Sequence, residues 1–167
     1  IKNYYIKHLS NKKLLFTSPQ YFKSVFREKI KKYIKEMDTI GVVARDIYGN
    51  IASGSSTGGL TNRPCGRLGD THMNGISTIA DNRYAGIVVT GHGENIIKHH
   101  VASNVFYNIK YSNISLKKAI NKVIKECPKC GIIGIDNEGN IFHNKNTDRM
   151  YVGMCSNKLS IKISIWD

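Results

Sequence analysis

Two hydrophobic periods divide this chain of 167 residues into predicted helices and predicted strands. Apolar side chains recur at helical spacing between residues 19 and 37, with lysines between them, which predicts an amphipathic helix. A second helix is predicted from Glu94 to about Tyr111, and a third begins after Ser115, a residue type that favours helix N-caps. The inward positions of these two later helices are Ile97, Val101, Val105 and Ile109, then Leu116, Ala119, Ile120, Val123 and Ile124.

Short apolar runs bounded by turn residues predict strands, and the first two form a β-hairpin. An apolar run from Thr39 to Ala44 is followed by a turn at residues 46–50 and by a return strand that reaches Thr57. If the strands pair about this turn, the hydroxyl groups of Thr39 and Thr57 lie side by side. Further strands are predicted at residues 85–90, 131–136, 141–143, 149–154 and 159–166, which places the chain in the α+β class.

The threonine that opens the hairpin is a candidate nucleophile. A threonine hydroxyl attacks poorly unless a base lies beside it, and one solution is the threonine's own α-amine, freed by cutting the chain before it. A free α-amine has a pKa of about 7.7 to 8.0, so a good part of it is unprotonated near neutral pH. The bond between Asp38 and Thr39 is therefore a candidate autocleavage site.

A charged pair between glycines follows the hairpin, in the segment Gly66-Arg67-Leu68-Gly69-Asp70. The glycines let the backbone turn tightly and present Arg67 and Asp70 to one pocket. Arginine binds a carboxylate through two parallel hydrogen bonds and aspartate binds an ammonium, and an α-amino acid carries both groups. Because such a pair is more often a surface ion pair, the segment indicates amino-acid binding only together with the threonine hairpin.

The strand predicted at residues 85–90 ends in Thr90-Gly91 and leads through Gly93 into a helix. Small residues at a strand end, beside a helix N-terminus, expose backbone N–H groups that suit a developing oxyanion. His92, between the two glycines, invites an acid–base role, but we interpret it as a bystander.

These segments together resemble the β-subunit of plant-type L-asparaginases and isoaspartyl peptidases, which are N-terminal-nucleophile hydrolases. The resemblance covers about residues 17–167 and rests on motifs that keep the family's order and spacing: Thr-Ile-Gly-Val-Val-Ala, Ser-Thr-Gly-Gly, Gly-Arg-x-Gly-Asp and Thr-Gly-x-Gly-Glu. It implies an αββα sandwich fold, of which this chain carries mostly one half. Residues 1–38 would be the tail of the α-subunit, and residues 39–167 would be the β-subunit.

The resemblance also implies roles and partners. Thr39 would be the nucleophile and, through its amine, the base; Thr57 would orient it; Thr90 and the Gly91 N–H would stabilise the oxyanion. The substrate-binding residues would be Arg67, Leu68, Gly69, Asp70, Gly91 and Gly93. The substrate would be L-asparagine or a β-aspartyl dipeptide, and the partner would be the protein's own α-subunit in an (αβ)2 homo-oligomer. No cofactor or metal is expected at these residues, although the family's α-subunit carries a sodium-binding loop.

One segment departs from the family pattern. His72 stands where the family usually has proline, and Ile76 and Ile79 replace an alanine and an aromatic residue. We expect the bulkier Ile76 to reshape the pocket wall and alter substrate preference rather than the chemistry.

Charge and hydropathy bound the partners. The net charge of +13 is concentrated at the start, where residues 1–38 hold ten basic and three acidic residues, a balance of +7. Nucleic-acid binding would fit this charge, but the basic residues are not interleaved with surface aromatic residues, so a solvated helix face is favoured. No apolar run approaches the roughly 18 residues needed to span a membrane, and no signal peptide is visible, so we expect a cytoplasmic protein.

Cysteine chemistry is weakly indicated. Cys127 and Cys130 form a CxxC pair, but a zinc site needs four ligands, and the adjacent His99 and His100 would point apart on a helix. We interpret the pair as a turn that holds two thiols.

Three other functions stay open. Glycosylasparaginases and a threonine endopeptidase share the framework and commonly carry aspartate before the nucleophile, as Asp38 does here. Ser-Thr-Gly-Gly in place of Ser-Thr-Asn-Gly disfavours the first, and an intact Gly-Arg-x-Gly-Asp disfavours the second. The third is a basic binding module, or a degenerate fragment that folds only with a partner.

Overall fold

The computed structural model describes residues 39–60, 63–148, 150–156 and 159–164. Its elements are β1 Thr39–Arg45, β2 Ile51–Thr57, β3 Thr78–Asp81, β4 Ala85–Gly91, α3 Gly93–His99, α4 Val101–Ser112, α5 Leu116–Glu126, β5 Cys130–Asp136, β6 Ile141–Lys145, β7 Val152–Ser156 and β8 Leu159–Ser164. The strands pair antiparallel in three sheets, so the protein is of the mixed α+β class, as predicted. The helix predicted at residues 19–37 and the cut-site residue Asp38 lie outside the described residues.

The predicted hairpin is formed by β1 and β2, and one side chain fixes its turn. Asp46 Oδ1 accepts hydrogen bonds from the N–H groups of Tyr48 and Asn50, at 2.9 and 2.8 Å. An aspartate that binds the backbone just after it favours a tight turn, and Gly49 completes this one at a φ of 89°. The resulting register pairs Thr39 with Thr57, which confirms the predicted juxtaposition.

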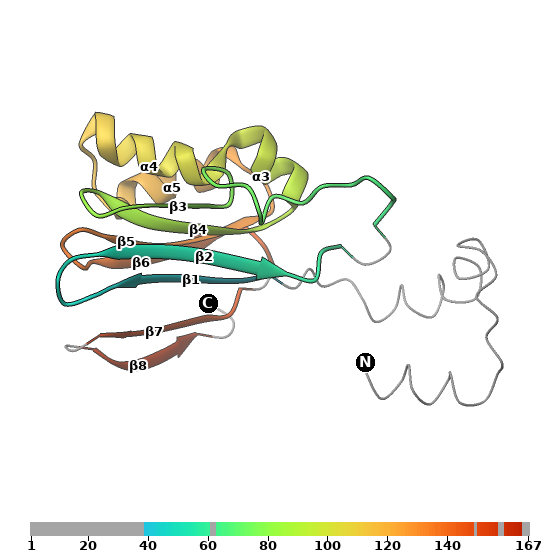
Figure 1. Ribbon diagram of the computed structural model, residues 1–167. Coiled ribbons are helices and arrows are strands. Elements are labelled where there is room, and N and C mark those ends of the chain that lie inside the picture. Colours follow the sequence, from blue (N-terminus) through green and yellow to red (C-terminus); the bar gives the residue numbers. More distant parts are fainter. Residues whose placement is uncertain (1–38, 61–62, 149, 157–158, 165–167) are drawn as a thin grey trace, which may run out of the picture. The chain divides into compact units, whose positions relative to one another are not determined.

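The hairpin packs on one face of the four-stranded sheet β3-β4-β5-β6, and helices α4 and α5 cover the other face (Figure 1). The two sheets approach closely at Gly86, where a Cβ would lie only 2.7 Å from Ile51 Cγ2. On the helix side, β4 contributes alternate residues to the hydrophobic core. The largest fully buried aliphatic side chains are Ile87, Val89, Ile96, Val101, Val105, Ile120, Val123 and Ile132. Successive residues of β4 thus contact the hairpin on one face of the sheet and the helices on the other.

The single helix predicted from Glu94 to Tyr111 is wrong, because the chain breaks it at His100. This residue is left-handed, with φ of 47°, and ends α3 before α4 begins. The break lets the first free N–H groups of α4 bond a loop: Ala102 N–H donates to the Ile76 carbonyl at 3.0 Å and Ser103 N–H to the Gly75 carbonyl at 2.8 Å. The break also changes the inward face of α3, where Ile96 rather than the predicted Ile97 is fully buried.

Helix α5, which is the third helix predicted from the sequence, follows the prediction closely. Its five predicted inward residues are all buried. Ser115 occupies the N-cap position, although its side chain makes no capping hydrogen bond and its carbonyl accepts from Ala119 N–H at 3.0 Å. The predicted cap is therefore right in position and wrong in mechanism.

Strand bounds differ from the prediction at several places. The short strand β3 was missed, since its four residues include one large apolar side chain, Ile79, too few for a recognisable period. The strand predicted at residues 149–154 begins later, at Val152. The last strand ends at Ser164, and residues 165–166 of the predicted strand lie outside the described residues.

Candidate active site

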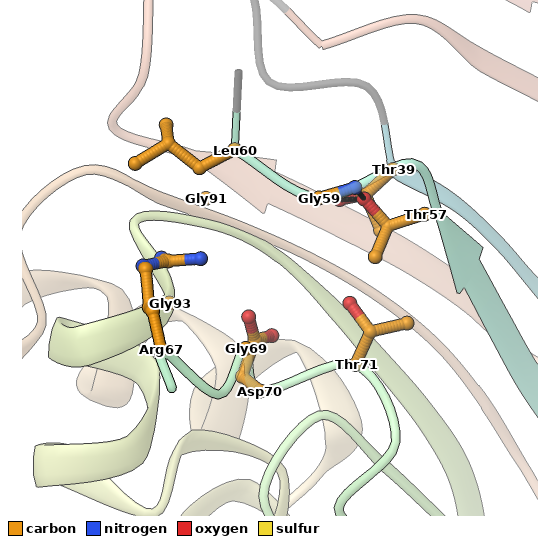
Figure 2. Close-up of a pocket in the computed structure, with 10 residues that line it drawn as sticks. All are labelled: Thr39, Thr57, Gly59, Leu60, Arg67, Gly69, Asp70, Thr71, Gly91 and Gly93. Atoms are coloured by element: carbon orange, nitrogen blue, oxygen red, sulfur yellow. Dashed lines mark hydrogen bonds between the residues drawn. The ribbon is translucent and has the colours of Figure 1, made fainter. Parts of the chain in front are cut away.

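A pocket lies where β1 begins and β2 ends, facing the junction between β4 and α3 (Figure 2). Its lining residues are Thr39, Thr57, Gly59, Leu60, Arg67, Gly69, Asp70, Thr71, Gly91 and Gly93. Three segments predicted to be functional on separate grounds therefore meet at one place. Figure 2 shows the polar ends of Arg67, Asp70 and Thr71 directed into the space that they share with Thr39 and Thr57.

The two threonines are paired through their hydroxyl groups. Thr39 Oγ1 lies 3.5 Å from Thr57 Oγ1, in a geometry in which Thr39 donates. Thr57 Oγ1 also accepts the N–H of Gly59 at 3.0 Å, which ties the end of β2 to the loop that follows it. The fixed register of the hairpin holds this pair in place, because both residues stand at the end of the same ladder.

Arg67 and Asp70 come from the loop before β3 and face the same pocket. Asp70 is 8% exposed and the Arg67 side chain 13% exposed, so both charges are largely withdrawn from water. Gly93 makes room for them, since a Cβ there would lie 2.8 Å from Asp70 Oδ1 and 3.3 Å from Arg67 Nη2. Asp70 is thus buried in the pocket wall, and Arg67 is partly buried beside it.

Glu94 is not a lining residue, but it binds Arg67 within this wall, and the sequence interpretation missed it. Its carboxylate accepts from Arg67 Nε at 2.6 Å and from Arg67 Nη2 at 3.0 Å, a bidentate pair. Glu94 thereby fixes the plane of the guanidinium and leaves Nη1 on the far edge. The signal was present in the sequence as the glutamate of Thr-Gly-x-Gly-Glu, but nothing in the pattern links it to a residue 27 positions earlier.

The Arg67 pair lowers the pKa of Glu94 to about 2, chiefly through the side-chain hydrogen bond. A carboxylate with a depressed pKa in the folded state stabilises the fold above its unfolded pKa, and this stabilisation is lost as the pH falls toward the folded value. We therefore expect Glu94→Gln to lower Tm at neutral pH, with the difference from wild type shrinking between about pH 4.3 and pH 2. Because the Glu94 side chain is half exposed, solvent screening keeps the effect small.

Measuring the Tm of wild type and variant at pH values from 2 to 7 tests this prediction. Asp81→Asn is the positive comparison: Asp81 has a pKa lowered to about 2 by its pair with Arg83 and lies outside the pocket, so its Tm difference should shrink over the same pH range. A Tm difference for Glu94→Gln that is constant from pH 7 to pH 2 would show that the carboxylate charge does not contribute.

Gly91 also lines the pocket, and its backbone requires glycine. Its φ is 138°, and a Cβ there would lie 2.7 Å from Cys130 Cα on the neighbouring strand.

Thr90 and Leu68 are placed differently from expectation. Neither is among the lining residues: the Thr90 methyl group lies beside Gly131, and Leu68 is 65% exposed. Their predicted roles stay predictions.

Three lining residues were not singled out from the sequence. Gly59 is the last residue of the Ser-Thr-Gly-Gly motif, Leu60 follows it, and Thr71 follows Asp70, so each belongs to or adjoins a recognised motif. The Thr71 carbonyl accepts a hydrogen bond from the Ser55 hydroxyl at 3.1 Å, which connects the charged loop to β2. His92 is not a lining residue; its Nδ1 lies 3.3 Å from Glu94 Oε2 without the geometry of a hydrogen bond.

The described residues contain no group of three or more His, Cys, Asp or Glu side chains placed to hold a metal ion. Cys127, at the end of α5, and Cys130, the first residue of β5, are buried free thiols, and burial raises the pKa of both. In the described part of the chain, no helix is long and apolar enough to cross a membrane.

The fold and the site define a class: a mixed α+β protein whose paired threonines share a pocket with an arginine and an aspartate. The family model described as asparaginase matches residues 4–165, and the chain belongs to this asparaginase family. The family implies the N-terminal-nucleophile hydrolase fold, and its members are asparaginase and isoaspartyl peptidase hydrolases. The predicted resemblance is confirmed.

Three relatives illustrate the similarity. The isoaspartyl peptidase of Salmonella typhimurium is 38% identical over 122 residues, which cover 70% of this chain and 39% of that protein. The isoaspartyl peptidase of Escherichia coli is 38% identical over 70% of this chain and 38% of its own length. The probable isoaspartyl peptidase/L-asparaginase 2 of Arabidopsis thaliana is 33% identical over 78% of this chain and 41% of its own. The chain thus spans about two fifths of the length of these relatives.

Proposed function

We propose that the complete protein is an autoprocessing amidohydrolase that cleaves L-asparagine or β-aspartyl dipeptides through Thr39. The observation that carries the proposal is the shared pocket, which places the Thr39–Thr57 hydroxyl pair opposite Arg67 and Asp70. A hydroxyl nucleophile beside groups complementary to an α-carboxylate and an α-ammonium fits a substrate that is an amino acid with an amide on its side chain. The relatives named above are isoaspartyl peptidases and a probable isoaspartyl peptidase/L-asparaginase, which supports these two activities.

Processing would use the same hydroxyl as turnover. The Thr39 oxygen attacks the carbonyl carbon of Asp38, the hydroxyl proton passes to the Thr39 nitrogen as the bond from that nitrogen to the carbonyl carbon breaks, and an ester joins the two residues. Water then hydrolyses the ester, which leaves a carboxylate on Asp38 and a free α-amine on Thr39. The pairing of Thr39 with Thr57 supports this step, because the hydroxyl that must attack already stands at a fixed place in the ladder.

Turnover then follows from the free amine. The Thr39 amine takes the hydroxyl proton as the oxygen attacks the side-chain carbonyl of the substrate, while Thr57 polarises the nucleophile. The tetrahedral oxyanion is stabilised by Thr90 and the Gly91 N–H, ammonia or an amino acid leaves with a proton, and water hydrolyses the aspartyl ester on Thr39. Arg67 and Asp70 hold the α-carboxylate and the α-ammonium throughout.

An α-subunit is the partner that this reading requires. The outer face of the hairpin exposes apolar residues: Ile40 is 67% exposed and Val42 58% exposed. Exposed apolar side chains on adjacent pleats of a two-stranded sheet are typical of a surface that another element covers. We propose that an α-subunit supplies further strands of the second sheet and the outer helix layer of an αββα sandwich. We expect the two subunits to form an (αβ)2 assembly in the cytoplasm.

The test uses the complete natural protein. Mass spectrometry and N-terminal sequencing should find a chain that begins at Thr39, and purified protein should release ammonia from L-asparagine or free amino acid from β-aspartyl dipeptides. Cleavage of a glycosylated asparagine in preference to both would assign the protein to the glycosylasparaginases instead. Salt-dependent retention on nucleic acid without amidase activity would favour a binding module.

Arg67→Ala is expected to raise KM for L-asparagine by roughly 10- to 100-fold, because the substrate carboxylate loses a charged hydrogen-bond partner in a site withdrawn from water. Steady-state kinetics on processed enzyme measures the effect. Arg83→Ala is the matched control, since it also breaks an arginine–carboxylate pair, with Asp81, but outside the pocket. Equal KM values for the two variants would remove Arg67 from substrate binding.

A further inference from the structure

A loop outside the pocket, residues 127–130, supports the glycine proposed to bind the oxyanion. Gly91 pairs with Cys130 across β4 and β5, and the next residue, His92, donates its N–H to the Lys129 carbonyl at 2.9 Å. The backbones are in direct contact here, which is why Gly91 has no room for a Cβ. The position of the Gly91 N–H therefore depends on the position of this loop.

The loop does not have a conformation that its sequence favours. Lys129 has a φ of 56°, in the left-handed region that residues with a Cβ rarely adopt. Such a conformation persists where the surrounding structure fixes it. The contacts that fix it here come from two asparagines, one on each side of the loop.

Asn146, just after β6, makes most of these contacts. Its Nδ2 donates to the carbonyls of Ile124 and Cys127, both at 2.7 Å. Its Oδ1 accepts from the Cys130 N–H at 2.7 Å, and its own N–H donates to the Cys130 carbonyl at 2.9 Å. From the other side, Asn95 Nδ2 donates to the Pro128 carbonyl at 3.0 Å.

We propose that Asn146 is a positioning residue for catalysis, which holds residues 127–130 so that Gly91 presents its N–H to the oxyanion. This inference rests on the proposed function for its catalytic meaning. Asn146 does not touch the pocket, and it acts through Cys130 and Lys129. An amide is required because one side chain must donate twice and accept once; a carboxylate lacks the donors and a methyl group lacks all three.

The same arrangement accounts for the CxxC pair. The Cys130 thiol donates to the Cys127 carbonyl at 3.3 Å, and this carbonyl also accepts from Asn146. Both thiols are fully buried, which suits packing against the end of α5 rather than chemistry at the surface. The pair is thus part of the loop that supports Gly91.

The experiment compares Asn146→Ala with Asn144→Ala in the complete natural protein. Asn144 is the matched control: its Nδ2 also bonds α5, at Asn121 Oδ1 and 2.7 Å, and its Oδ1 accepts from the Lys145 N–H at 2.8 Å, so these side-chain hydrogen bonds do not involve the loop. We expect Asn146→Ala to lower kcat about tenfold with KM changed by less than about twofold, the split expected when oxyanion stabilisation alone is weakened. Asn144→Ala should lower Tm while keeping kcat within about twofold of wild type.

Amide hydrogen exchange gives a readout that does not depend on activity. The His92 N–H bonds Lys129 directly, so its exchange should accelerate in Asn146→Ala and not in Asn144→Ala. If Asn146→Ala does not fold, Asn146→Ser is measured in the same way. Unchanged His92 exchange, unchanged kcat, or an equal loss of kcat in Asn144→Ala would overturn the proposal. If wild-type protein lacks amidase activity, the proposed function fails, and the exchange comparison alone decides whether Asn146 positions the loop.

Discussion

Replacing Thr39 with alanine is expected to leave the bond after Asp38 uncut and to reduce amide hydrolysis by roughly 10⁴-fold or more, as for other nucleophiles whose loss disables a catalytic unit. The variant lacks the hydroxyl that would attack in both processing and turnover. Alanine removes the hydroxyl and methyl groups of a half-buried strand residue, so the hairpin should persist with its register unchanged. The mass of the purified protein and the rate of ammonia release measure the two effects.

Thr39→Ser is the control, because serine keeps the hydroxyl in the same place in the ladder. It should be processed and retain measurable activity. Processing of Thr39→Ala at the same bond would show that a separate protease cuts the chain. Loss of activity in a correctly processed Thr39→Ser enzyme would show that the threonine methyl group, and not only the hydroxyl, is required to hold the nucleophile.

The hairpin could be predicted from the sequence because its determinants are local. Asp46 and Gly49 fix the turn within five residues, and the turn fixes the register that brings Thr39 to Thr57. Helix α5 was predictable for a similar reason, since its apolar stripe repeats without interruption from Leu116 to Ile124. In both cases short-range chemistry and packing favour the same structure.

The helix break at His100 could not be predicted in this way. Residues 94–111 keep a helical period throughout, and the break is stabilised by carbonyls of Gly75 and Ile76, which approach only in the folded protein. Glu94 was missed for the same reason: its partner Arg67 lies on another segment. Tertiary hydrogen bonds decided both outcomes, and a periodic pattern carries no information about them.

The candidate site was likewise predictable in part: its segments could be predicted, and the orientation of its side chains could not. The motifs indicated which segments carry chemistry, and the fold brought Arg67, Asp70, Gly91 and Thr39 to one pocket. Within a motif, the sequence did not indicate which side chains face inward. Leu68 stands between the lining residues Arg67 and Gly69 and is exposed. This exposure could not be predicted, because an irregular loop has no period from which to infer the orientation of a side chain.

Thr90→Val in processed enzyme is expected to lower kcat by roughly 10² to 10³, the usual effect of losing one oxyanion donor, with little change in KM. Valine has nearly the shape of threonine, so the substitution removes the hydroxyl while keeping the methyl group that lies beside Gly131. The structure sharpens this test. Gly91 lines the pocket and Thr90 does not, so the proposed oxyanion role of Thr90 requires its hydroxyl to reach the pocket from outside the lining.

Thr78→Val is the matched control, the same substitution on β3 of the same sheet and outside the pocket lining. If Thr90 stabilises the oxyanion, Thr90→Ser should keep most of the activity, Thr90→Val should lose it, and Thr78→Val should resemble wild type. If Thr90 is instead a strand residue chosen for its β-propensity, Thr90→Val should match Thr78→Val, because valine favours strands at least as well. Wild-type kcat in Thr90→Val would exclude the Thr90 hydroxyl from the oxyanion site and leave the Gly91 N–H as the proposed donor.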